Sequence, residues 1–553
     1  MIERPSADEL LFLPLGGAGE IGMNLNLYGH AGKWLMVDLG ITFGDESTPG
    51  IDVIMPDPQF IVERSEDLAG LVLTHAHEDH IGAVPYLWPQ LRCPIYATPF
   101  TASVLRRKLV EAGLQHDARI TEVPMSGRFT VGPFEIELIT LTHSIPEPNA
   151  VVVRTPLGTV LHTGDWKLDP EPLVGPSTDE AALQQLGDEG VLALIGDSTN
   201  VMVEGQSGSE AEVRESLMEL VGRFENRVAV ASFASNVARL ETLAHVAAAH
   251  DRHLALVGRS FWHVNQAARE NGYLTDLPEF VTEQEVGYLP RDKVLMACTG
   301  SQGEPRSALA RIARNEHPSV TLEKGDAVIF SSRIIPGNER SIGHLQNNLV
   351  RLGVDIVTER EHFVHVSGHP ARDELAAMYR WIRPKIAVPV HGELRHLSAH
   401  AEFAESLQVG QAVVAPNGSV VRLAPGAAEI IDEAPVGRLG LDGKALVSLG
   451  GSVLRSRQRA LRNGSAVATL VVDREGSLIA EPQIAAQGLL DPERDQAGFE
   501  AAVAAIRDAI EGATAELRRD DAALKEAARL ALRRALQANR GKKPVVDIHL
   551  VRV

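Results

Sequence analysis

The chain has 553 residues, of which 44% are hydrophobic and 23% are charged, and its formal net charge is −20. This length is too great for a single hydrophobic core and predicts two to four domains. No apolar run approaches the roughly 20 residues that span a bilayer, and the first residues lack the pattern of a secretory signal, so we expect a cytoplasmic protein without a membrane partner. Only two cysteines, Cys93 and Cys298, are present, which excludes a disulfide-stabilised scaffold.

The charge balance does not decide what the protein binds. A net charge of −20 argues against nucleic acid, because phosphate binding usually requires a basic face. From Gly451 to Val553, however, 17 Lys and Arg residues outnumber 14 Asp and Glu residues. Bound divalent cations would offset part of the acidic excess elsewhere. A nucleic-acid partner therefore stays open.

The first part of the chain alternates short apolar runs with turns and predicts a sheet. The runs Leu11–Leu15 and Trp34–Val37 flank the glycine-rich segment Gly16–Asn24. No Gly-Lys-Ser/Thr follows this segment, so we interpret it as a turn and not as a phosphate-binding loop. Further strands are expected at 134–141, 150–154, 159–162 and 191–195. Polar residues at the ends of such strands commonly build the site of a layered α/β fold.

The segment Thr74–His80, THAHEDH, places three histidines and an aspartate within six positions. It follows the apolar Leu71–Leu73 and precedes the apolar Ile81–Leu87, so it predicts a strand, a tight loop and the start of a helix. Neutral imidazoles and carboxylates suit Zn²⁺ or Mn²⁺. The alternative, a surface cluster or histidines that cap a helix, accounts poorly for this spacing.

The histidine segment resembles the metal-binding motif of the metallo-β-lactamase superfamily. The resemblance implies that His75 and His77 hold one ion and that Asp79 and His80 hold a second. Two ions about 3.5–4 Å apart can share a hydroxide and stabilise both oxygens of a phosphoryl displacement. His143 and Asp165 follow later strands, where each residue alone would more often be structural. In this order the resemblance makes His143 a further ligand of the first ion and Asp165 a bridge between the two, while Asp38 would orient the histidine loop.

From about Gly208 the pattern changes to alternating helices and parallel-type strands. Helices are expected at 209–223 and 237–249, and strands at 227–231, 254–257, 294–298 and 326–330. We interpret this segment as an inserted domain, because motifs that belong with the first part return after it. A Pro/Gly/Ala stretch at 423–428 begins a linking region, and an amphipathic pattern over Phe499–Asn539 with a final strand over Val545–Val553 predicts a small α/β appendage.

Five further motifs occur in the order seen in β-CASP nucleases: Gly196–Asn200, Ala231–Asn236, Thr299–Pro305, Ser367–Pro370 and Pro389–Glu393. Together with GGAGEIGMN they resemble the bacterial ribonuclease J family over nearly the whole chain. The resemblance implies an α/β fold, namely a metallo-β-lactamase αββα sandwich with an inserted β-CASP domain and a small C-terminal α/β domain. The implied bounds are 1–207 and 366–425 for the two parts of the sandwich, 208–365 for the insertion, 426–458 for the linking region and 459–553 for the C-terminal domain.

The same resemblance assigns roles to individual residues. Asp197, His369 and His391 fall in the family's motifs A, B and C, and a histidine in motif C favours RNA over DNA. One ion would be held by His75, His77, His143 and Asp165, and the other by Asp79, His80, Asp165 and His391. His369, paired with Asp197, would protonate or steer the leaving oxygen. Ser235, His365 and Ser367 would contact a 5′ monophosphate, although a turn or a helix cap explains the two serines equally well.

The implied function is a metal-dependent ribonuclease, acting as a 5′ to 3′ exonuclease on single-stranded RNA with 5′-monophosphate ends and, as a second mode, as an endonuclease. We expect two divalent ions per chain, Zn²⁺ or else Mn²⁺ or Mg²⁺, a homodimer or homotetramer, partners in an RNA-degradation complex, and roles in mRNA decay and rRNA maturation. The alternatives are another hydrolase on the same scaffold, which would lack the insertion, and a non-catalytic RNA-binding component of a degradosome, which would have lost metal ligands.

Overall fold

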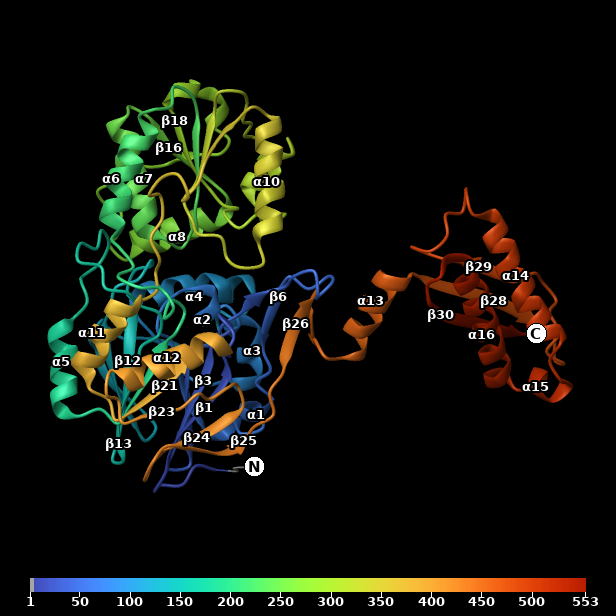
Figure 1. The fold of residues 1–553 in the computed structure, drawn as a ribbon, viewed down its shortest axis with the longest axis horizontal. Helices are drawn as coiled ribbons and strands as arrows, with labels where there is room; N and C mark the ends of the chain where they lie inside the picture. The colour runs from blue at the N-terminus through green and yellow to red at the C-terminus, as the bar shows by residue number, and fades with distance from the viewer. Residues whose placement is uncertain (1–3) are drawn as a thin grey trace. The chain divides into compact units, whose positions relative to one another are not determined.

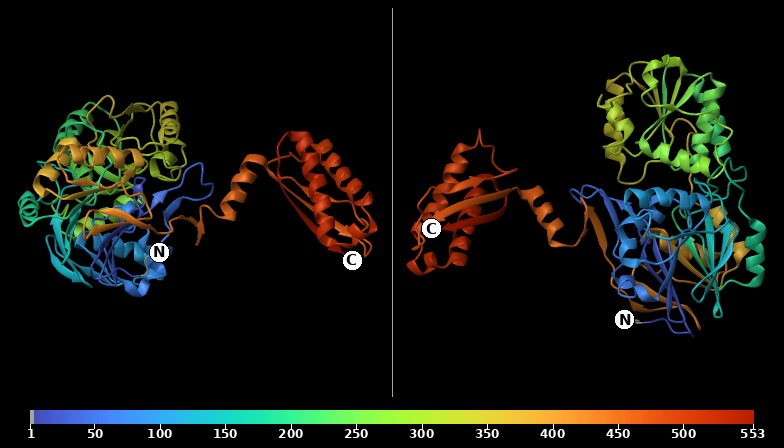
Figure 2. Two further views of the ribbon diagram at one scale, coloured as in Figure 1. Left: turned by 60° about the horizontal axis from the view of Figure 1, so that its bottom comes forward. Right: turned by 180° about the vertical axis from the view of Figure 1, so that it is seen from behind.

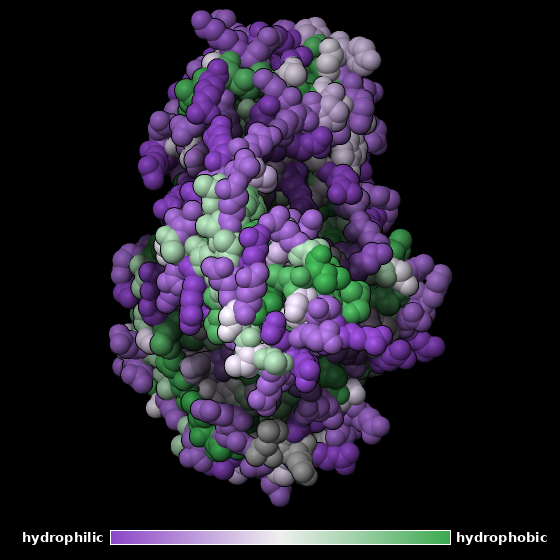
Figure 3. Space-filling view, turned by 90° about the vertical axis from the view of Figure 1, so that its right-hand side faces the viewer, coloured by the Kyte–Doolittle hydropathy of each residue, from purple (hydrophilic) through white to green (hydrophobic). Residues whose placement is uncertain are grey.

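The computed structural model describes residues 4–553. Two compact units are present: unit 1 extends through Thr42 and resumes from Met55 to Val436, and unit 2 comprises Phe43–Ile54 and Gly437–Val553 (Figure 1). On the face drawn in Figure 3, hydrophilic residues predominate and hydrophobic ones lie in separate patches. Among the described residues, no helix combines the length and apolar character that crossing a membrane requires.

Unit 1 is built on two sheets. The first has the strand order β25 (Glu429–Glu433), β24 (Ser419–Ala424), β1 (Leu10–Gly16), β3 (Leu25–His30), β4 (Lys33–Val37), β7 (Leu68–Val72), β8 (Ile95–Ala97), β9 (Ile120–Glu122). The second has the order β10 (Arg128–Val131), β11 (Phe134–Thr140), β12 (Asn149–Thr155), β13 (Gly158–His162), β14 (Ala193–Asp197), β21 (Ile386–Val390), β23 (Gln411–Ala412). A two-stranded ladder joins β2 (Ala18–Gly19) to β22 (Gly392–Glu393).

The two sheets share one hydrophobic core. Phe12, Tyr28 and Val37 of the first sheet belong to the same buried cluster as Val151 and Ile195 of the second. Strands that are covered on both faces are expected to be apolar almost throughout, as β1 is. These buried runs are what made the strands visible in the sequence.

Helices cover the outer faces of the sandwich. Beside the first sheet lie α1 (Gln59–Val62), η1 (Ser65–Asp67), α2 (Glu78–Ile81), α3 (Val84–Leu91) and α4 (Pro99–Glu111) (Figure 1). On the second sheet lie α5 (Glu180–Glu189), α11 (Arg372–Ile382) and α12 (Leu394–Ser406). Leu183 of α5 and Leu375 of α11 pack in one cluster with Leu161 and Leu194 of the sheet. The predicted αββα sandwich is therefore confirmed.

The inserted domain is a six-stranded parallel sheet with helices on both faces (Figure 2). Its strand order is β17 (Val281–Thr282), β16 (His253–Val257), β18 (Val294–Cys298), β15 (Val228–Ala231), β19 (Ala327–Phe330), β20 (Asp355–Val357). Its helices are α6 (Glu210–Val221), α7 (Val237–Ala249), α8 (Arg259–Glu270), η2 (Val286–Tyr288), η3 (Arg291–Lys293), α9 (Ala308–Ala313) and α10 (Glu339–Arg351). The parallel α/β insertion expected from the sequence is confirmed.

Two small sheets lie wholly or mainly in unit 2. One has the order β27 (Ala445–Ser448), β26 (Arg438–Asp442), β6 (Val53–Pro56), β5 (Thr42–Phe43), and the other has the order β29 (Gln483–Ala485), β28 (Ser465–Val472), β30 (Val545–Arg552). Its helices are α13 (Ser452–Asn463), α14 (Gln496–Glu511), α15 (Ala515–Arg519) and α16 (Asp521–Arg540). Alternate residues of β28, such as Ala468 and Leu470, pack with Ile506 of α14 and Leu532 of α16. The expected linking region, 426–458, is itself folded, because β25, β26, β27 and the start of α13 fall within it.

Candidate metal centre

The histidine loop begins where β7 ends, and its geometry depends on Asp38 at the end of the neighbouring parallel strand β4. Asp38 adopts φ 63°. Its Oδ1 accepts the Thr74 amide at 2.8 Å, and its Oδ2 accepts the Thr74 hydroxyl at 2.8 Å and lies 2.6 Å from Nδ1 of His80. Asp38 therefore orients both ends of the loop, as a carboxylate behind a metal ligand does. Gly40 allows the close approach of the two segments, since a Cβ there would lie 1.6 Å from the Asp79 carbonyl oxygen.

Three imidazoles and one carboxylate converge in a first cluster. Nε2 of His75 lies 3.1 Å from Nδ1 of His77, which lies 3.0 Å from Nε2 of His143, and Oδ2 of Asp165 lies 4.0 Å from Nε2 of His75. Burial lowers the pKa of His77 to about 4 and the pKa of His75 and of His143 well below the usual range. The rings are therefore neutral at pH 7, the form in which imidazole binds a metal. These four residues could hold one ion.

The orientation of His143 comes from a residue 225 positions later in the chain. Its Nδ1 donates to the carbonyl oxygen of Gly368 at 2.5 Å, which leaves Nε2 facing His77. A Cβ at position 368 would lie 2.6 Å from Cε1 of His143, so only glycine fits against the ring. The motif that contains His369 thus also orients a residue of the first cluster.

A second cluster shares Asp165 with the first and adds Asp79, His80 and His391. Nε2 of His80 lies 3.1 Å from Oδ2 of Asp165, and Nε2 of His391 lies 3.1 Å from Oδ2 of Asp79. Oδ1 of Asp165 is buried without a hydrogen-bond partner. Nε2 of His391 lies 3.6 Å from this oxygen, too far for a hydrogen bond. A buried carboxylate oxygen without a hydrogen bond is costly, and a cation shared by the two clusters would satisfy it. The donor set therefore fits divalent metal.

The local charges of the second cluster favour protons when no ion is bound. Burial disfavours the charged forms of His80 and His391, but nearby carboxylates, Asp165 first among them, outweigh burial and raise the pKa of both rings well above the usual value. Burial alone would raise the pKa of Asp165, yet His391, His80 and His369 lower it to about 2. Protons and a metal ion would thus compete for the same nitrogens.

His391 reaches the cluster through an unusual backbone conformation. It follows β21 with φ 53°, and its amide donates to the Gly17 carbonyl at 2.6 Å. Its Nδ1 lies 2.8 Å from the hydroxyl of Thr199. The glycine-rich segment that we interpreted as a turn therefore helps to hold the backbone of His391 through this hydrogen bond.

The predicted pair Asp197 and His369 lies beside both clusters. Nδ1 of His369 lies 2.8 Å from Oδ2 of Asp197, whose Oδ1 accepts the Thr199 amide at 2.9 Å and hydroxyl at 2.7 Å. Burial opposes a charge on His369, but Asp197 and then Asp165 raise its pKa above the usual value. The ring stacks on His391 with centroids 5.4 Å apart. This geometry favours the protonated form of the imidazole next to the clusters.

The three residues predicted to contact phosphate come from two segments that Arg239 connects. Arg239 is fully buried, pairs with Glu210 at 3.0 Å and donates to the Val364 carbonyl at 3.0 Å. It thereby joins the helix that follows Ser235 to the segment that carries His365 and Ser367. The hydroxyl oxygen of Ser367 accepts from Nδ2 of Asn200 at 2.7 Å. Burial, followed by the charge of Arg239, lowers the pKa of His365 to about 3.

Several contacting residues had no predicted role. Asn24, Thr199 and Asn200 lie inside motifs that the sequence made visible, and Nδ2 of Asn24 lies 3.2 Å from Nε2 of His80. A buried chain of side-chain hydrogen bonds behind Asp197, centred on His400, was not predicted from the sequence. In it, Nδ1 of His400 lies 2.8 Å from the Ser198 hydroxyl, and Nε2 lies 2.9 Å from the Tyr379 hydroxyl.

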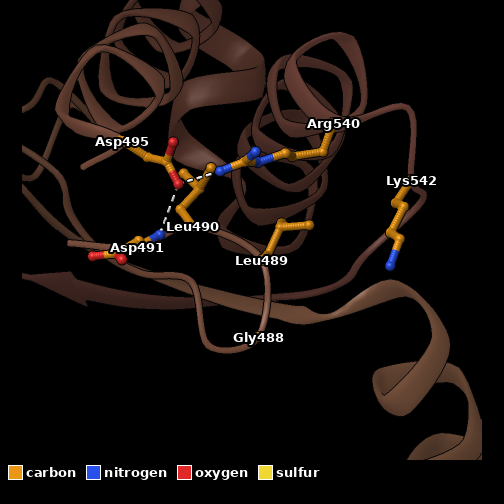
Figure 4. A pocket seen from close by; sticks show the side chains of 7 residues that line it. All are labelled: Gly488, Leu489, Leu490, Asp491, Asp495, Arg540 and Lys542. Carbon is orange, nitrogen blue, oxygen red and sulfur yellow. Dashed lines mark hydrogen bonds and ion pairs between the residues drawn. The ribbon is translucent and has the colours of Figure 1, made fainter. Parts of the chain in front are cut away.

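A separate cavity of about 620 Å³ lies in unit 2 (Figure 4). Its lining includes Leu489, Asp495, Arg540 and Lys542, and Arg540 pairs with Asp495. None of the predicted site residues lines it. The polar clusters of unit 1 are therefore the candidate site.

Four family models match the chain. They are described as "Beta-lactamase superfamily domain" at residues 48–185, "Ribonuclease J, beta-CASP domain" at 225–349, "Zn-dependent metallo-hydrolase RNA specificity domain" at 353–416, and "Ribonuclease J C-terminal domain" at 452–553. A crystal structure of a protein of unknown function from Enterococcus faecalis V583 matches with a TM-score of 0.52 and 14% identity, over 75% of this chain and 100% of that one. That likeness shows the fold alone.

Three similar proteins carry related names. Ribonuclease J of Sinorhizobium meliloti is 46% identical over 99% of this chain and 98% of its own length. Ribonuclease J of Mycolicibacterium smegmatis is 42% identical over 83% of each chain. Ribonuclease J2 of Bacillus subtilis is 32% identical over 99% of each chain. From the near-complete coverage and the matched domains, we conclude that this chain belongs to the ribonuclease J family.

Proposed function

We propose that this protein is a metal-dependent ribonuclease that hydrolyses phosphodiester bonds of RNA. The observation that carries the proposal is the position of Asp165, which belongs to both clusters and has a buried oxygen that accepts no hydrogen bond from the described residues. Its relatives named ribonuclease J support RNA as the substrate.

Two divalent ions per chain fit the donor atoms. His75, His77, His143 and Asp165 would hold one ion, and Asp79, His80, Asp165 and His391 the other. Nitrogen and carboxylate ligands favour Zn²⁺, with Mn²⁺ or Mg²⁺ as alternatives. When bound, the ions would supply Lewis-acid stabilisation of the phosphoryl oxygens and activation of the attacking water. Asp38 and the Gly368 carbonyl would keep two imidazoles aimed at the ions, through His80 and His143 respectively.

His369 would act as the general acid. Its contact with buried Asp197 keeps the ring oriented and favours its protonated form. A proton on the other nitrogen, Nε2, could then pass to the 3′ oxygen that leaves the phosphorus. Asn200 supports this arrangement, because its Nδ2 donates to the His369 carbonyl at 3.1 Å as well as to Ser367.

The preference for a 5′-monophosphate end would come from Ser235, His365 and Ser367. Hydroxyl groups and a neutral imidazole donate hydrogen bonds to phosphate without adding charge. Because Asn200 contacts both Ser367 and His369, the phosphate pocket and the general acid would keep a constant separation. Such a separation lets the enzyme remove one nucleotide at a time from the 5′ end. A triphosphate is bulkier and more highly charged, so it would fit this pocket poorly.

In the cell, we propose action on single-stranded transcripts in the cytoplasm, in mRNA decay and rRNA maturation. A homodimer or homotetramer and association with an RNA-degradation complex complete the proposal. Endonucleolytic cleavage would be a second mode of the same centre.

Product analysis tests the proposed function. A 5′-labelled, monophosphorylated RNA is incubated with the protein and Mn²⁺, and released mononucleotides would establish 5′ to 3′ exonuclease action. His77→Ala should abolish release, whereas His116→Ala, at an exposed position of the same domain, should leave it unchanged. Full activity of His77→Ala at saturating metal would refute the proposed centre, and internal fragments alone would leave endonuclease action as the only mode.

A further inference from the structure

Glu147 is a buried carboxylate between the lactamase-type sandwich and the inserted domain. It is 5% exposed and lies in the loop that leads from His143 to β12. One of its oxygens, Oε2, accepts the Phe100 amide of the first turn of α4 at 2.9 Å. The other, Oε1, accepts the hydroxyl of Tyr273, which follows α8, at 3.2 Å. A single side chain thus connects the loop of His143 both to α4 of its own domain and to the inserted domain.

The backbone at Glu147 is held in a conformation that glutamate rarely adopts. Its φ is 57°, in the left-handed region. Its carbonyl accepts Nδ2 of Asn149 at 2.7 Å, and the Asn149 amide donates to the carbonyl of Thr74 at 3.1 Å. A strained residue persists only where its surroundings hold it in place. Here the surroundings include Thr74, the residue directly before His75.

The inserted domain contacts α4 around this point. The rings of Phe100 and Tyr273 are 6.2 Å apart and nearly perpendicular. Nδ2 of Asn271 donates to the Ser103 hydroxyl at 3.0 Å, and Arg107 pairs with Glu270 at 2.6 Å. Tyr273 remains a hydrogen-bond donor, because burial and then the neighbouring Glu147 raise its pKa well above the usual value. These contacts position the Tyr273 hydroxyl against Glu147.

We propose that Glu147 is a positioning residue. It couples the contact between the inserted domain and α4 to the affinity of the first cluster for its metal ion. When Tyr273 is in place, its hydroxyl and the Phe100 amide hold the carboxylate, and the carboxylate holds the loop in the strained turn. That turn sets the position of His143 relative to His75 and His77. The proposal rests on the proposed function in taking this cluster as a metal site. Neither Glu147 nor Tyr273 belongs to a motif that the sequence made visible.

The test measures metal affinity of the full-length protein by competition with a chromophoric chelator, using Zn²⁺ alone and no RNA. Tyr273→Phe removes one hydroxyl from the inserted domain, and Glu147→Gln removes the charge. Each should weaken Zn²⁺ binding about 10-fold, the usual effect of losing a group that orients a ligand. Tyr288→Phe is the matched control, because Tyr288 is 88% exposed on the same domain and should bind as the wild type does.

Kinetics and a double variant distinguish a residue that positions the metal cluster from one that only stabilises the contact between the two domains. With RNA, kcat should fall while KM stays close to that of the wild type. Tyr273→Phe combined with Glu147→Gln should lose no more affinity than the weaker-binding single variant, since both act through one contact. Additive losses, or a lower melting temperature with unchanged Zn²⁺ affinity, would overturn the proposal.

Two further measurements keep the outcomes distinct. Glu147→Ala removes the carboxylate but keeps the Cβ and therefore the strain of the left-handed backbone, so wild-type affinity in that variant would show that the carboxylate is not needed and would overturn the proposal. A wild-type protein that binds none of Zn²⁺, Mn²⁺ and Mg²⁺ would refute the proposed function itself. A wild type that binds Zn²⁺ and cleaves RNA, with Tyr273→Phe indistinguishable from it, would refute only the coupling.

Discussion

Nδ1 of His80 lies 2.6 Å from Oδ2 of Asp38, although 42 positions separate the two residues in the chain. The same carboxylate also accepts two hydrogen bonds from Thr74. One side chain outside both clusters therefore orients the loop that supplies four of their members. The first prediction follows from this relationship.

Asp38→Asn should weaken metal binding by about 10- to 100-fold, because the amide cannot accept all three hydrogen bonds. Asparagine tolerates positive φ, so the backbone at 63° adds little strain to this variant. Elemental analysis after dialysis against a weak chelator measures the retained metal. Asp117→Asn, at an exposed position, is the control, and equal retention by Asp38→Asn and wild type would contradict the assigned role.

Asp197→Asn should lower kcat by about 10²- to 10⁴-fold, the usual contribution of a general acid. The variant should also change the pH profile. Asp197 raises the pKa of His369 in the wild type, so His369 remains protonated to higher pH than an ordinary histidine. Without that carboxylate, the loss of kcat on the alkaline side should begin at lower pH. If kcat of Asp197→Asn falls on the alkaline side at the same pH as kcat of the wild type, His369 is excluded as the general acid.

Metal binding should release protons. In the metal-free protein the pKa of His80 and of His391 is well above the usual value, so both rings are protonated at pH 7. A bound ion needs their neutral nitrogens, and about two protons should leave at neutral pH. Affinity should therefore fall as pH is lowered. Titration calorimetry in buffers of different ionisation enthalpy measures the release, and an enthalpy independent of the buffer would contradict it.

A 5′-monophosphorylated RNA should be degraded faster than its 5′-triphosphorylated form. Ser367→Ala should reduce this difference, because it removes one donor from the proposed pocket. Initial rates on the two forms of one RNA give the ratio, and Ser177→Ala, at an exposed position of the same domain, provides the serine control. Equal rates on both ends by the wild type would refute the pocket.

Arg239→Met should destabilise the inserted domain by about 3–5 kcal/mol, because Glu210 would be left as a buried charge without a partner. Hydrogen exchange at the amides of α6 and α7 measures the local free energy of opening. Arg340→Met, at an exposed position of the same domain, should change it little. If Arg239→Met leaves the free energy of opening of α6 and α7 unchanged, the ion pair between Arg239 and Glu210 contributes no net stability.

Much of the fold was predictable because it depends on short-range patterns. The strands β15, β16, β18 and β19 appeared as apolar runs, and α7 over Val237–Ala249 agrees with the predicted helix. The segment expected to link the domains was harder to interpret. Its strands β25 and β26 are short and partly exposed, so their sequences lack a long apolar run.

The sequence by itself determined which chemical groups gather after β7, because His75, His77, Asp79 and His80 share one local turn. Motif order supplied the more distant members of the clusters. Only the tertiary structure decided how these groups are held, since hydrogen bonds from His143 to the Gly368 carbonyl and from Tyr273 to Glu147 join segments more than a hundred residues apart. Such contacts depend on how layers pack and leave no periodic signal in the chain. The carboxylate of Asp165 becomes the shared member of two clusters only when both sheets of the sandwich meet.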